Sequence, residues 1–129
     1  MITRQSFRFR LDNSSGVPVY RQLIDQVQAG IATGVLGLGY QLPTVRQVAV
    51  DLAINPNTVM RAYRELEIRG VLDTQQGTGT FIAAQRPQID DDDGRARRRE
   101  QLIDEFVARA GAGGFTLAEI LEALKERGN

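Results

Sequence analysis

Apolar residues recur every three or four positions in five stretches of the chain, which is the spacing of an amphipathic helix. In the first stretch, for example, Leu23, Ile24 and Val27 would share one face. The polar residues between them would face solvent. The sequence therefore predicts helices over about 18–33, 45–52, 56–69, 94–110 and 117–124.

Residues that favour helix ends bracket the second and third helices. Thr44 and Gln47 fit a capping box, in which the threonine oxygen accepts an N–H and the glutamine reaches back. Asn55 followed by Pro56 is a second start signal, because proline needs no N–H partner in the first turn. Gly70 is placed to end that helix. A short helix, a turn and a second helix are therefore expected here.

Strand patterns are short and few. Val71–Asp73 and Thr80–Ile82 are predicted to pair as a hairpin around the turn 75–79, because glycine tolerates positive φ. Near the N-terminus, apolar and charged residues alternate over Phe7–Asp12, which predicts a short strand or an extended arm. The expected fold class is mainly α with a small β wing.

Composition removes several kinds of chemistry. The chain has 129 residues, enough for one domain or a small domain with an appendage, and contains no Cys and no His. Disulfides, thiolate metal sites and the commonest general base are therefore absent. No two carboxylates are placed to act as a pair. We expect no enzyme activity, no cofactor and no bound metal.

No apolar run has the length of a membrane-spanning helix, and the N-terminus lacks the apolar core of a signal peptide. The sequence therefore predicts no membrane association and a cytoplasmic location. The formal net charge of +0 argues against binding to nucleic acid. The charge is unevenly distributed, however: residues 1–86 carry a net +3 and residues 87–129 a net −3. The basic excess coincides with the helix–turn–helix segment, although it is small.

The third helix has an outer face that suits the major groove of DNA. Its apolar residues must face the core, and on a helix with about 3.6 residues per turn this turns Asn57, Arg61 and Arg64 outward. Arginine can pair with guanine and asparagine with adenine, and Thr58 can reach a phosphate or a thymine methyl. An outward arginine is usually only solvated, so each residue alone is weak evidence.

Two neighbouring features strengthen the case for DNA. Arg46, one turn into the preceding helix, is suited to a phosphate or a base edge. At the tip of the hairpin, Gly77, Thr78 and Gly79 would let the backbone approach DNA closely. The combination of order, spacing and turn chemistry favours a nucleic-acid interface over an unrelated set of solvated residues.

The same segment resembles the winged helix-turn-helix of the GntR family of bacterial transcription regulators. The resemblance covers about residues 16–84, and the matching residues are Pro18–Leu23, Leu42–Arg46, Asn57–Val59, Ala62–Leu66, Gly70 and Gly77–Phe81. It implies that Thr44 and Arg46, the start of the third helix and the glycine-rich wing tip contact DNA. It also implies a DNA-binding domain over residues 1–84 and a separate tail over residues 85–129.

One departure limits what can be transferred from the family. Several members place arginine at the positions that Pro56 and Met60 occupy here. Those two DNA contacts cannot be carried over, and Arg61 is the nearest substitute. The run Asn55–Val59 followed by Arg61–Tyr63 resembles the YtrA-like branch, which has a short helical tail in place of a large ligand-binding domain.

The tail is expected to serve dimerisation. Its two helices each carry one apolar stripe and are too short to be stable alone, so they must pack on something. They could cover their own DNA-binding domain. We instead favour pairing with a second subunit, because two-fold proteins bind palindromic half-sites about 34 Å apart. A small-molecule effector is expected from the family alone, in a pocket between tail and DNA-binding domain or across the dimer.

Two charge runs in this half of the chain are weak signals. Asp90–Asp93 lacks the ligand spacing of a cation site, and its last residues are better placed to cap the next helix. Arg95–Arg99 has acidic neighbours, which favours a solvated helix face over a phosphate patch.

The predicted function is sequence-specific binding of double-stranded operator DNA by a dimeric transcriptional repressor. The alternative is a winged helix used only for protein interaction.

Overall fold

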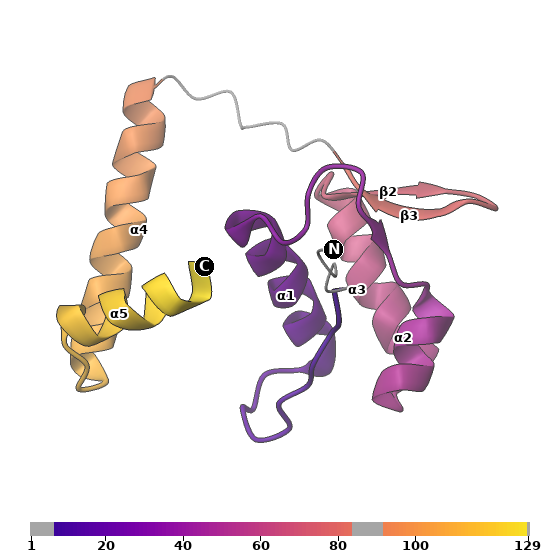
Figure 1. Ribbon diagram of the computed structural model, residues 1–129, viewed down its shortest axis with the longest axis horizontal. Helices are drawn as coiled ribbons and strands as arrows, with labels where there is room; N and C mark the ends of the chain where they lie inside the picture. Colours follow the sequence, from indigo (N-terminus) through magenta and orange to yellow (C-terminus); the bar gives the residue numbers. More distant parts are fainter. Residues whose placement is uncertain (1–6, 84–91, 129) are drawn as a thin grey trace, which may run out of the picture. The chain divides into compact units, whose positions relative to one another are not determined.

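The computed structural model describes residues 7–83 and 92–128 of the chain. The chain divides into two compact units, Met1–Gln85 and Arg86–Asn129. We call residues 7–83 the winged unit and residues 92–128 the tail. The helices and strands are α1 (Val19–Thr33), β1 (Gln41–Leu42), α2 (Val45–Leu52), α3 (Pro56–Ile68), β2 (Leu72–Gln75), β3 (Gly79–Ile82), α4 (Asp92–Ala112) and α5 (Leu117–Gly128) (Figure 1).

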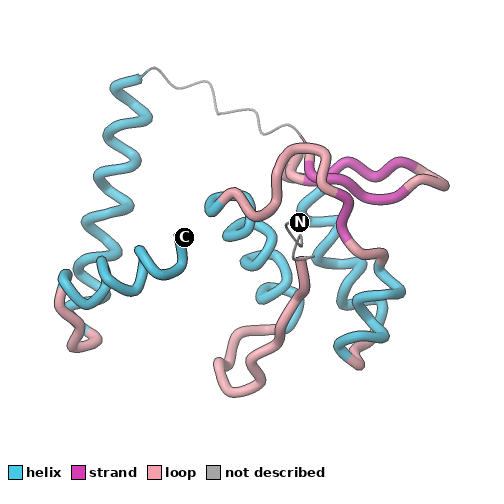
Figure 2. The backbone as a smooth tube through the Cα atoms, viewed as in Figure 1, coloured by secondary structure: helices cyan, strands magenta, loops and turns pink. Residues whose placement is uncertain are grey.

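The winged unit combines three helices with a small antiparallel sheet of strand order β1-β3-β2. Strands β2 and β3 form the expected hairpin, with Leu72 opposite Ile82 and Gln75 opposite Gly79 (Figure 2). The strand β1 was not predicted, because two residues give no alternating pattern. The fold class, mainly α with a small β wing, is confirmed.

A single core holds the winged unit together. Helix α3 lies at its centre and packs against both α1 and α2. Val59, Ala62, Tyr63 and Leu66, the predicted inner face of α3, are all buried. The other buried apolar residues are Phe9, Leu23, Ile24, Val27, Leu36, Leu42, Val48, Ala49, Val71, Leu72 and Ile82.

The predicted helix ends are confirmed. The Oγ1 of Thr44 accepts the N–H of Gln47 at 3.1 Å, and the Gln47 Oε1 accepts the N–H of Thr44 at 2.8 Å. The Asn55 Oδ1 accepts the N–H of Asn57 at 2.8 Å at the start of α3. Gly70, at φ 78°, follows the C-cap of α3 in the left-handed conformation. These caps fix the directions of α2 and α3.

Residues 7–12 form an arm and no strand, so the strand alternative for Phe7–Asp12 is wrong. The Phe9 ring is buried in the core, and the N–H of Phe7 donates to the Tyr40 hydroxyl at 2.8 Å. The arm is also tied to α1, because Arg10 exchanges backbone hydrogen bonds with the Gln26 amide. These side-chain bonds satisfy backbone groups that strand pairing would otherwise have satisfied.

The tail is a pair of helices, and each is longer than predicted. A capping box begins α5, where the Thr116 Oγ1 accepts the N–H of Glu119 at 3.1 Å and the Glu119 carboxylate accepts the N–H of Thr116 at 3.4 Å. No residue between 92 and 127 is buried. The apolar stripe of α4 is exposed, and it consists of Leu102, Ile103, Phe106 and Val107. Phe115, just before α5, and Leu117, Leu121 and Leu124 within α5 are exposed as well.

Within the part of the chain that the structure describes, no helix is both long and apolar enough to span a membrane. Residues 85–93, whose composition is typical of a linker, lie almost wholly outside the described residues, as do Asp90 and Asp91 of the acidic run.

Candidate nucleic-acid interface

The outer face of α3 is a continuous exposed surface. Asn57, Met60, Arg61, Arg64, Glu65 and Ile68 together line one shallow hollow of about 270 Å³. Ile68 is 74% exposed and Met60 47% exposed. The prediction that Asn57, Arg61 and Arg64 share an outward face is therefore confirmed in geometry.

Within residues 7–83 and 92–128, the arginines on this face have no carboxylate partner, apart from the pair that Arg69 makes. Arg64 is exposed and, among the described residues, has no carboxylate within ion-pair distance. Glu65 lies next to it but pairs with Arg69, with 3.3 Å between the Arg69 Nε and the Glu65 Oε1. Of the possible pairs between Glu65 or Glu67 and the arginines of α3, the structure shows the one between Glu65 and Arg69. Arg61 and Arg64 have no carboxylate partner among the described residues.

Arg61 does not project freely into solvent. Its guanidinium carbon lies 3.7 Å from the centroid of the Tyr20 ring, a cation–π contact between α3 and α1. Tyr20 is half-buried and packs against the core. A second hollow next to this contact is lined by Val19, Tyr20, Asn57, Thr58 and Arg61. It brings the half-buried Thr58 together with Asn57 and Arg61.

The start of α2 is held by a buried hydrogen bond. The Tyr63 hydroxyl of α3 donates to the carbonyl of Pro43 at 2.6 Å, and burial raises the pKa of Tyr63. Next along the chain, the Thr44 oxygen accepts the N–H of Gln47, which leaves the hydroxyl proton free to donate. Arg46 is exposed in the first turn of α2. Thr44 and Arg46 are therefore displayed on a fixed helix end.

The wing tip is braced from the neighbouring strand. Gly77 has φ 78° and Gly79 has φ 143°, both in the region that favours glycine. The Gln41 side chain of β1 donates to the carbonyl of Thr78 at 3.1 Å. A Cβ added at Gly79 would collide with the same Gln41 side chain. Gln41 thus supports the wing, and nothing in the sequence pattern indicated this.

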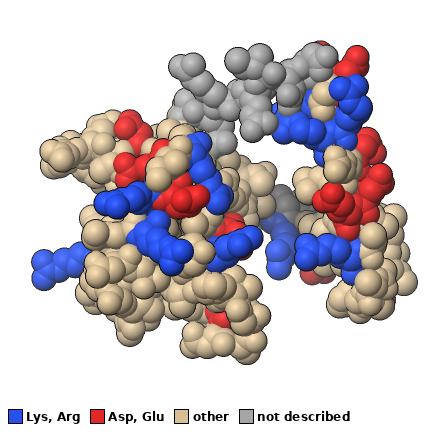
Figure 3. Space-filling model, turned by 180° about the vertical axis from the view of Figure 1, so that it is seen from behind, with Lys and Arg blue, Asp and Glu red and all other residues tan. Residues whose placement is uncertain are grey.

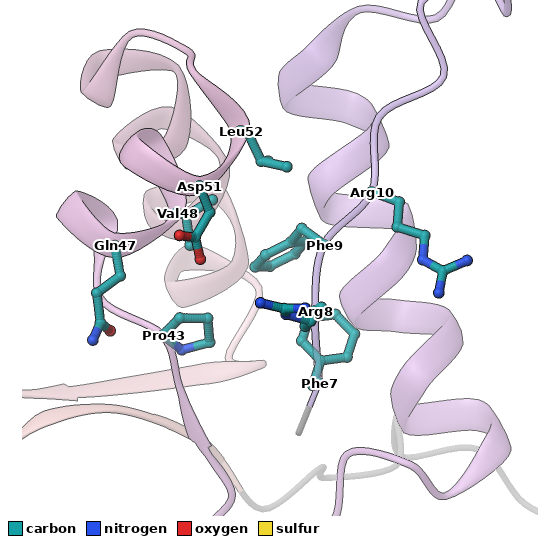
Figure 4. Close-up of a pocket in the computed structure, with 9 residues that line it drawn as sticks. All are labelled: Phe7, Arg8, Phe9, Arg10, Pro43, Gln47, Val48, Asp51 and Leu52. Atoms are coloured by element: carbon teal, nitrogen blue, oxygen red, sulfur yellow. The ribbon is translucent and has the colours of Figure 1, made fainter. Parts of the chain in front are cut away.

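A hollow of about 600 Å³ lies between the arm and α2 (Figure 4). Phe7, Phe9, Pro43, Val48 and Leu52 supply most of its apolar lining. The Arg8 and Asp51 side chains point into it from opposite sides, whereas Arg10 points away (Figure 4). Gln47, the capping residue of α2, also lines the hollow. The arm therefore packs beside the helix end that displays Thr44 and Arg46.

Basic side chains project from the winged unit beside acidic ones, and both signs are mixed along the tail helices (Figure 3). On α4, Arg99 lies 3.7 Å from Glu100, and Arg95 and Arg97 are exposed. This agrees with a solvated face for Arg95–Arg99. Within residues 7–83 and 92–128, no three acidic side chains are grouped so that they could hold a metal ion.

The three predicted parts of the interface therefore belong to one unit: the start of α2, the outer face of α3 and the wing tip. A helix–turn–helix of this kind with an adjoining β wing defines a winged helix-turn-helix protein. Sequence reasoning missed Tyr20 and Gln41, which hold the interface from α1 and β1. Tyr20 lies in the segment Pro18–Leu23 that matches the family, but periodicity alone does not show what a side chain touches.

Comparison with known proteins agrees with this assignment. The family model of bacterial regulatory proteins of the gntR family matches residues 19–82. The HTH-type transcriptional repressor YtrA of Bacillus subtilis is 32% identical over 117 residues, which is 91% of this chain and 89% of YtrA. The chain belongs to the GntR family. It is a DNA-binding transcriptional regulator that resembles YtrA.

Solved structures show the same architecture. A transcriptional antiterminator from Listeria monocytogenes EGD-e has a TM-score of 0.66 and 30% identity, and the match covers 98% of this chain and 92% of that chain. The DNA-binding domain of AraR in complex with operator ORE1 has a TM-score of 0.50 and 26% identity, covering 60% of this chain and 94% of that chain. These findings favour a DNA-binding regulator over a winged helix used only for protein interaction.

Proposed function

We propose that the chain is a non-enzymatic repressor that binds a palindromic operator as a homodimer and occludes a promoter. The observation that carries this proposal is the outer face of α3, where Asn57, Arg61 and Arg64 are exposed together. Among the described residues neither arginine is paired with a carboxylate, since Glu65 in the same hollow pairs with Arg69. Such a face matches the hydrogen-bonding pattern of base edges in the major groove.

Each part of the interface has a distinct role in this proposal. Asn57, Arg61 and Arg64 read base edges, and Thr58 contacts a phosphate or a thymine methyl. Thr44 donates its free hydroxyl proton to a phosphate, and Arg46 adds a charged contact at the same helix end. The wing tip at Gly77, Thr78 and Gly79 lies close to the sugar–phosphate backbone.

The homodimer is supported by the tail, whose apolar stripes are exposed along both helices. Exposed apolar surface of this kind marks an interaction site in a soluble protein. A second copy of the tail is the occupant that also explains binding to a palindrome, since two-fold symmetry in the protein then matches the DNA. The named relative YtrA is itself called a repressor, which supports repression here.

The test is a gel shift on DNA upstream of the chain's own gene. Arg61→Ala should weaken binding by about 5- to 150-fold, the loss expected for one base-reading arginine of about 1–3 kcal/mol, and Arg46→Ala should also weaken it. Arg109→Ala in α4 removes the same charge outside the interface and should leave binding within about 2-fold. If the two interface variants bind as the wild type does while the tail alone captures a protein partner, the protein-interaction alternative is correct.

A small-molecule effector stays a prediction from the family resemblance. A thermal-shift screen of metabolites checks it, and we expect a ligand that raises the melting temperature to change operator affinity as well. A screen without any stabilising metabolite would count against an effector.

A further inference from the structure

The cationic side chains on the outer face of α3 are held in two different ways. Arg64 is exposed and has no ion pair among the described residues. Arg61, one turn earlier, lies with its guanidinium 3.7 Å from the Tyr20 ring centroid. One arginine therefore has no charged partner among the described residues, and the other lies against a ring of α1.

Tyr20 is a stable support for this contact. It is the second residue of α1, it is half-buried, and its ring packs against the core of the winged unit. Helices α1 and α3 are also packed against each other. Packing against the core restricts the Tyr20 ring, so its face is a suitable support for a guanidinium group.

The stack leaves the useful part of Arg61 exposed. A guanidinium is planar and donates its N–H groups within that plane, so stacking one face on an aromatic ring leaves the donor edges open. A bidentate bond to guanine needs two of those donors in a defined plane. Holding the plane before binding removes much of the side-chain entropy that a free arginine would lose.

The position of Arg61 matters all the more in this chain because α3 has few other side chains that could hydrogen-bond to a base. Pro56 has no polar side-chain atom, and Met60 has only a thioether. Among the exposed residues of α3 that share the hollow with Arg61, only Asn57 and Arg64 add side-chain donors. Specificity at the start of α3 thus depends heavily on how precisely Arg61 is placed.

We infer that Tyr20 is a positioning residue that sets the guanidinium plane of Arg61 and thereby the base preference of the winged unit. The ligand is a guanine edge in the major groove. The inference rests on the proposed function, since it concerns how one of its residues is presented to DNA. Tyr20 acts through its ring face, and its hydroxyl is not needed.

The experiment is a double-mutant cycle on the full chain. Dissociation constants are measured at fixed salt for the operator and for a set of single-base variants of it. The proteins are the wild type, Tyr20→Leu, Tyr20→Phe, Arg61→Ala and the double variant Tyr20→Leu/Arg61→Ala. Tyr20→Phe is the matched control, because it keeps the ring and removes the hydroxyl.

We expect Tyr20→Leu to weaken operator binding by about 3- to 30-fold, the range of a cation–π contact, and to relax preference at the base pair that Arg61→Ala also relaxes. Tyr20→Phe should stay within about 2-fold of the wild type. In the Arg61→Ala background, Tyr20→Leu should add less than about 2-fold, because the residue it positions is gone.

Three results would overturn the inference. Additive losses in the cycle would show that Tyr20 acts independently of Arg61. A loss with Tyr20→Phe equal to that with Tyr20→Leu would assign the effect to the hydroxyl, for example on a phosphate. If Arg61→Ala weakens binding equally to all operator variants and reduces the salt dependence of binding, Arg61 contacts a phosphate and not a base.

A second variant and a spectrum cover the case in which Tyr20→Leu fails to fold. Arg61→Lys keeps the charge but lacks the planar group, so it should lose base preference while keeping most of the salt dependence. In the free protein, the Arg61 Nε–H resonance should be shifted by the Tyr20 ring in the wild type and in Tyr20→Phe. If that shift is absent, the stack does not form and the inference is wrong, whatever the DNA result.

Failure of the proposed function gives a different pattern. A wild-type chain that binds no DNA sequence overturns both proposals. A wild-type chain that binds its operator while the cycle shows no coupling overturns only the role of Tyr20.

Discussion

The winged unit and the tail are both built from amphipathic helices, yet they use their apolar residues in opposite ways. In the winged unit, 15 apolar side chains are buried in one core. In the tail, no residue between 92 and 127 is buried, and Phe106 is 46% exposed. Amphipathic periodicity therefore says that a helix has a face to cover, but it does not say what covers that face.

The difference has a physical origin in what each helix can reach. Helix α3 is enclosed by α1, α2 and the sheet, so its apolar face loses contact with water completely. Helices α4 and α5 contact each other within the tail, and two short helices cannot enclose a core between them. The winged unit is thus stabilised by its own packing, whereas the apolar stripes of the tail stay exposed.

The largest expected effect comes from the same substitution made in both regions. Leu66→Ala removes a side chain with 0% exposure from α3 and should lower the free energy of unfolding by about 3 kcal/mol. Leu121→Ala, at 49% exposure in α5, is the matched control. Its loss should be under about 1 kcal/mol in dilute protein, where dimers dissociate. Urea denaturation followed by circular dichroism at two protein concentrations measures both.

The comparison fails if Leu121→Ala costs as much as Leu66→Ala at every concentration. That outcome would mean that the tail has a core of its own within a single chain.

The second prediction tests what covers the tail. Phe106→Glu places a charge on the apolar stripe of α4 and should raise the dissociation constant of the homodimer at least about 100-fold, because burying an unpaired carboxylate is costly. Gln101→Glu adds the same charge at another exposed position of α4 and should change it little. Sedimentation equilibrium gives both constants. If the wild type is already a monomer at micromolar concentration, the dimer is excluded.

Local sequence signals predicted most of the winged unit. The capping residues Thr44, Asn55 and Gly70 and the inner face of α3 were all identified correctly, because they depend on residues within four positions of each other. The strand β1 was not predicted, because its two residues pair with a strand about 40 positions later and are too few to show an alternating pattern.

The contacts that hold the interface could not be predicted in this way. The Arg61 guanidinium lies on the ring of Tyr20, and the Gln41 amide donates to Thr78. Each pair joins residues about 40 positions apart, which only tertiary packing brings together. Gly30 is a similar case. A Cβ at this position would collide with the buried Leu36 side chain, so Leu36 in the loop after α1 can pack against α1 only because residue 30 is glycine. Periodicity gave the direction of a side chain but not its neighbour.

The smallest expected effect comes from a side-chain hydrogen bond in the core of the winged unit. Among the described residues, the tail has no buried residue that could make such a bond. The Tyr63 hydroxyl donates to the Pro43 carbonyl at 2.6 Å from within the core. Tyr63→Phe leaves that carbonyl without this donor and should lower the free energy of unfolding by about 1 kcal/mol at neutral pH. Chemical denaturation at pH 7 measures the loss.

The same hydroxyl gives the winged unit a pH dependence whose sign can be worked out. Burial raises the pKa of Tyr63 in the folded protein above its ordinary value of about 10. Above pH 10 the unfolded chain therefore loses this proton first, so the stabilisation is complete below pH 10 and declines as the pH rises further. The wild type should lose more stability than Tyr63→Phe between pH 9 and pH 11, because the two proteins differ only in the Tyr63 hydroxyl. Equal losses in the two proteins would mean that the Tyr63 hydroxyl is open to solvent. The winged unit would then not bury this polar group, and in that respect it would resemble the exposed tail.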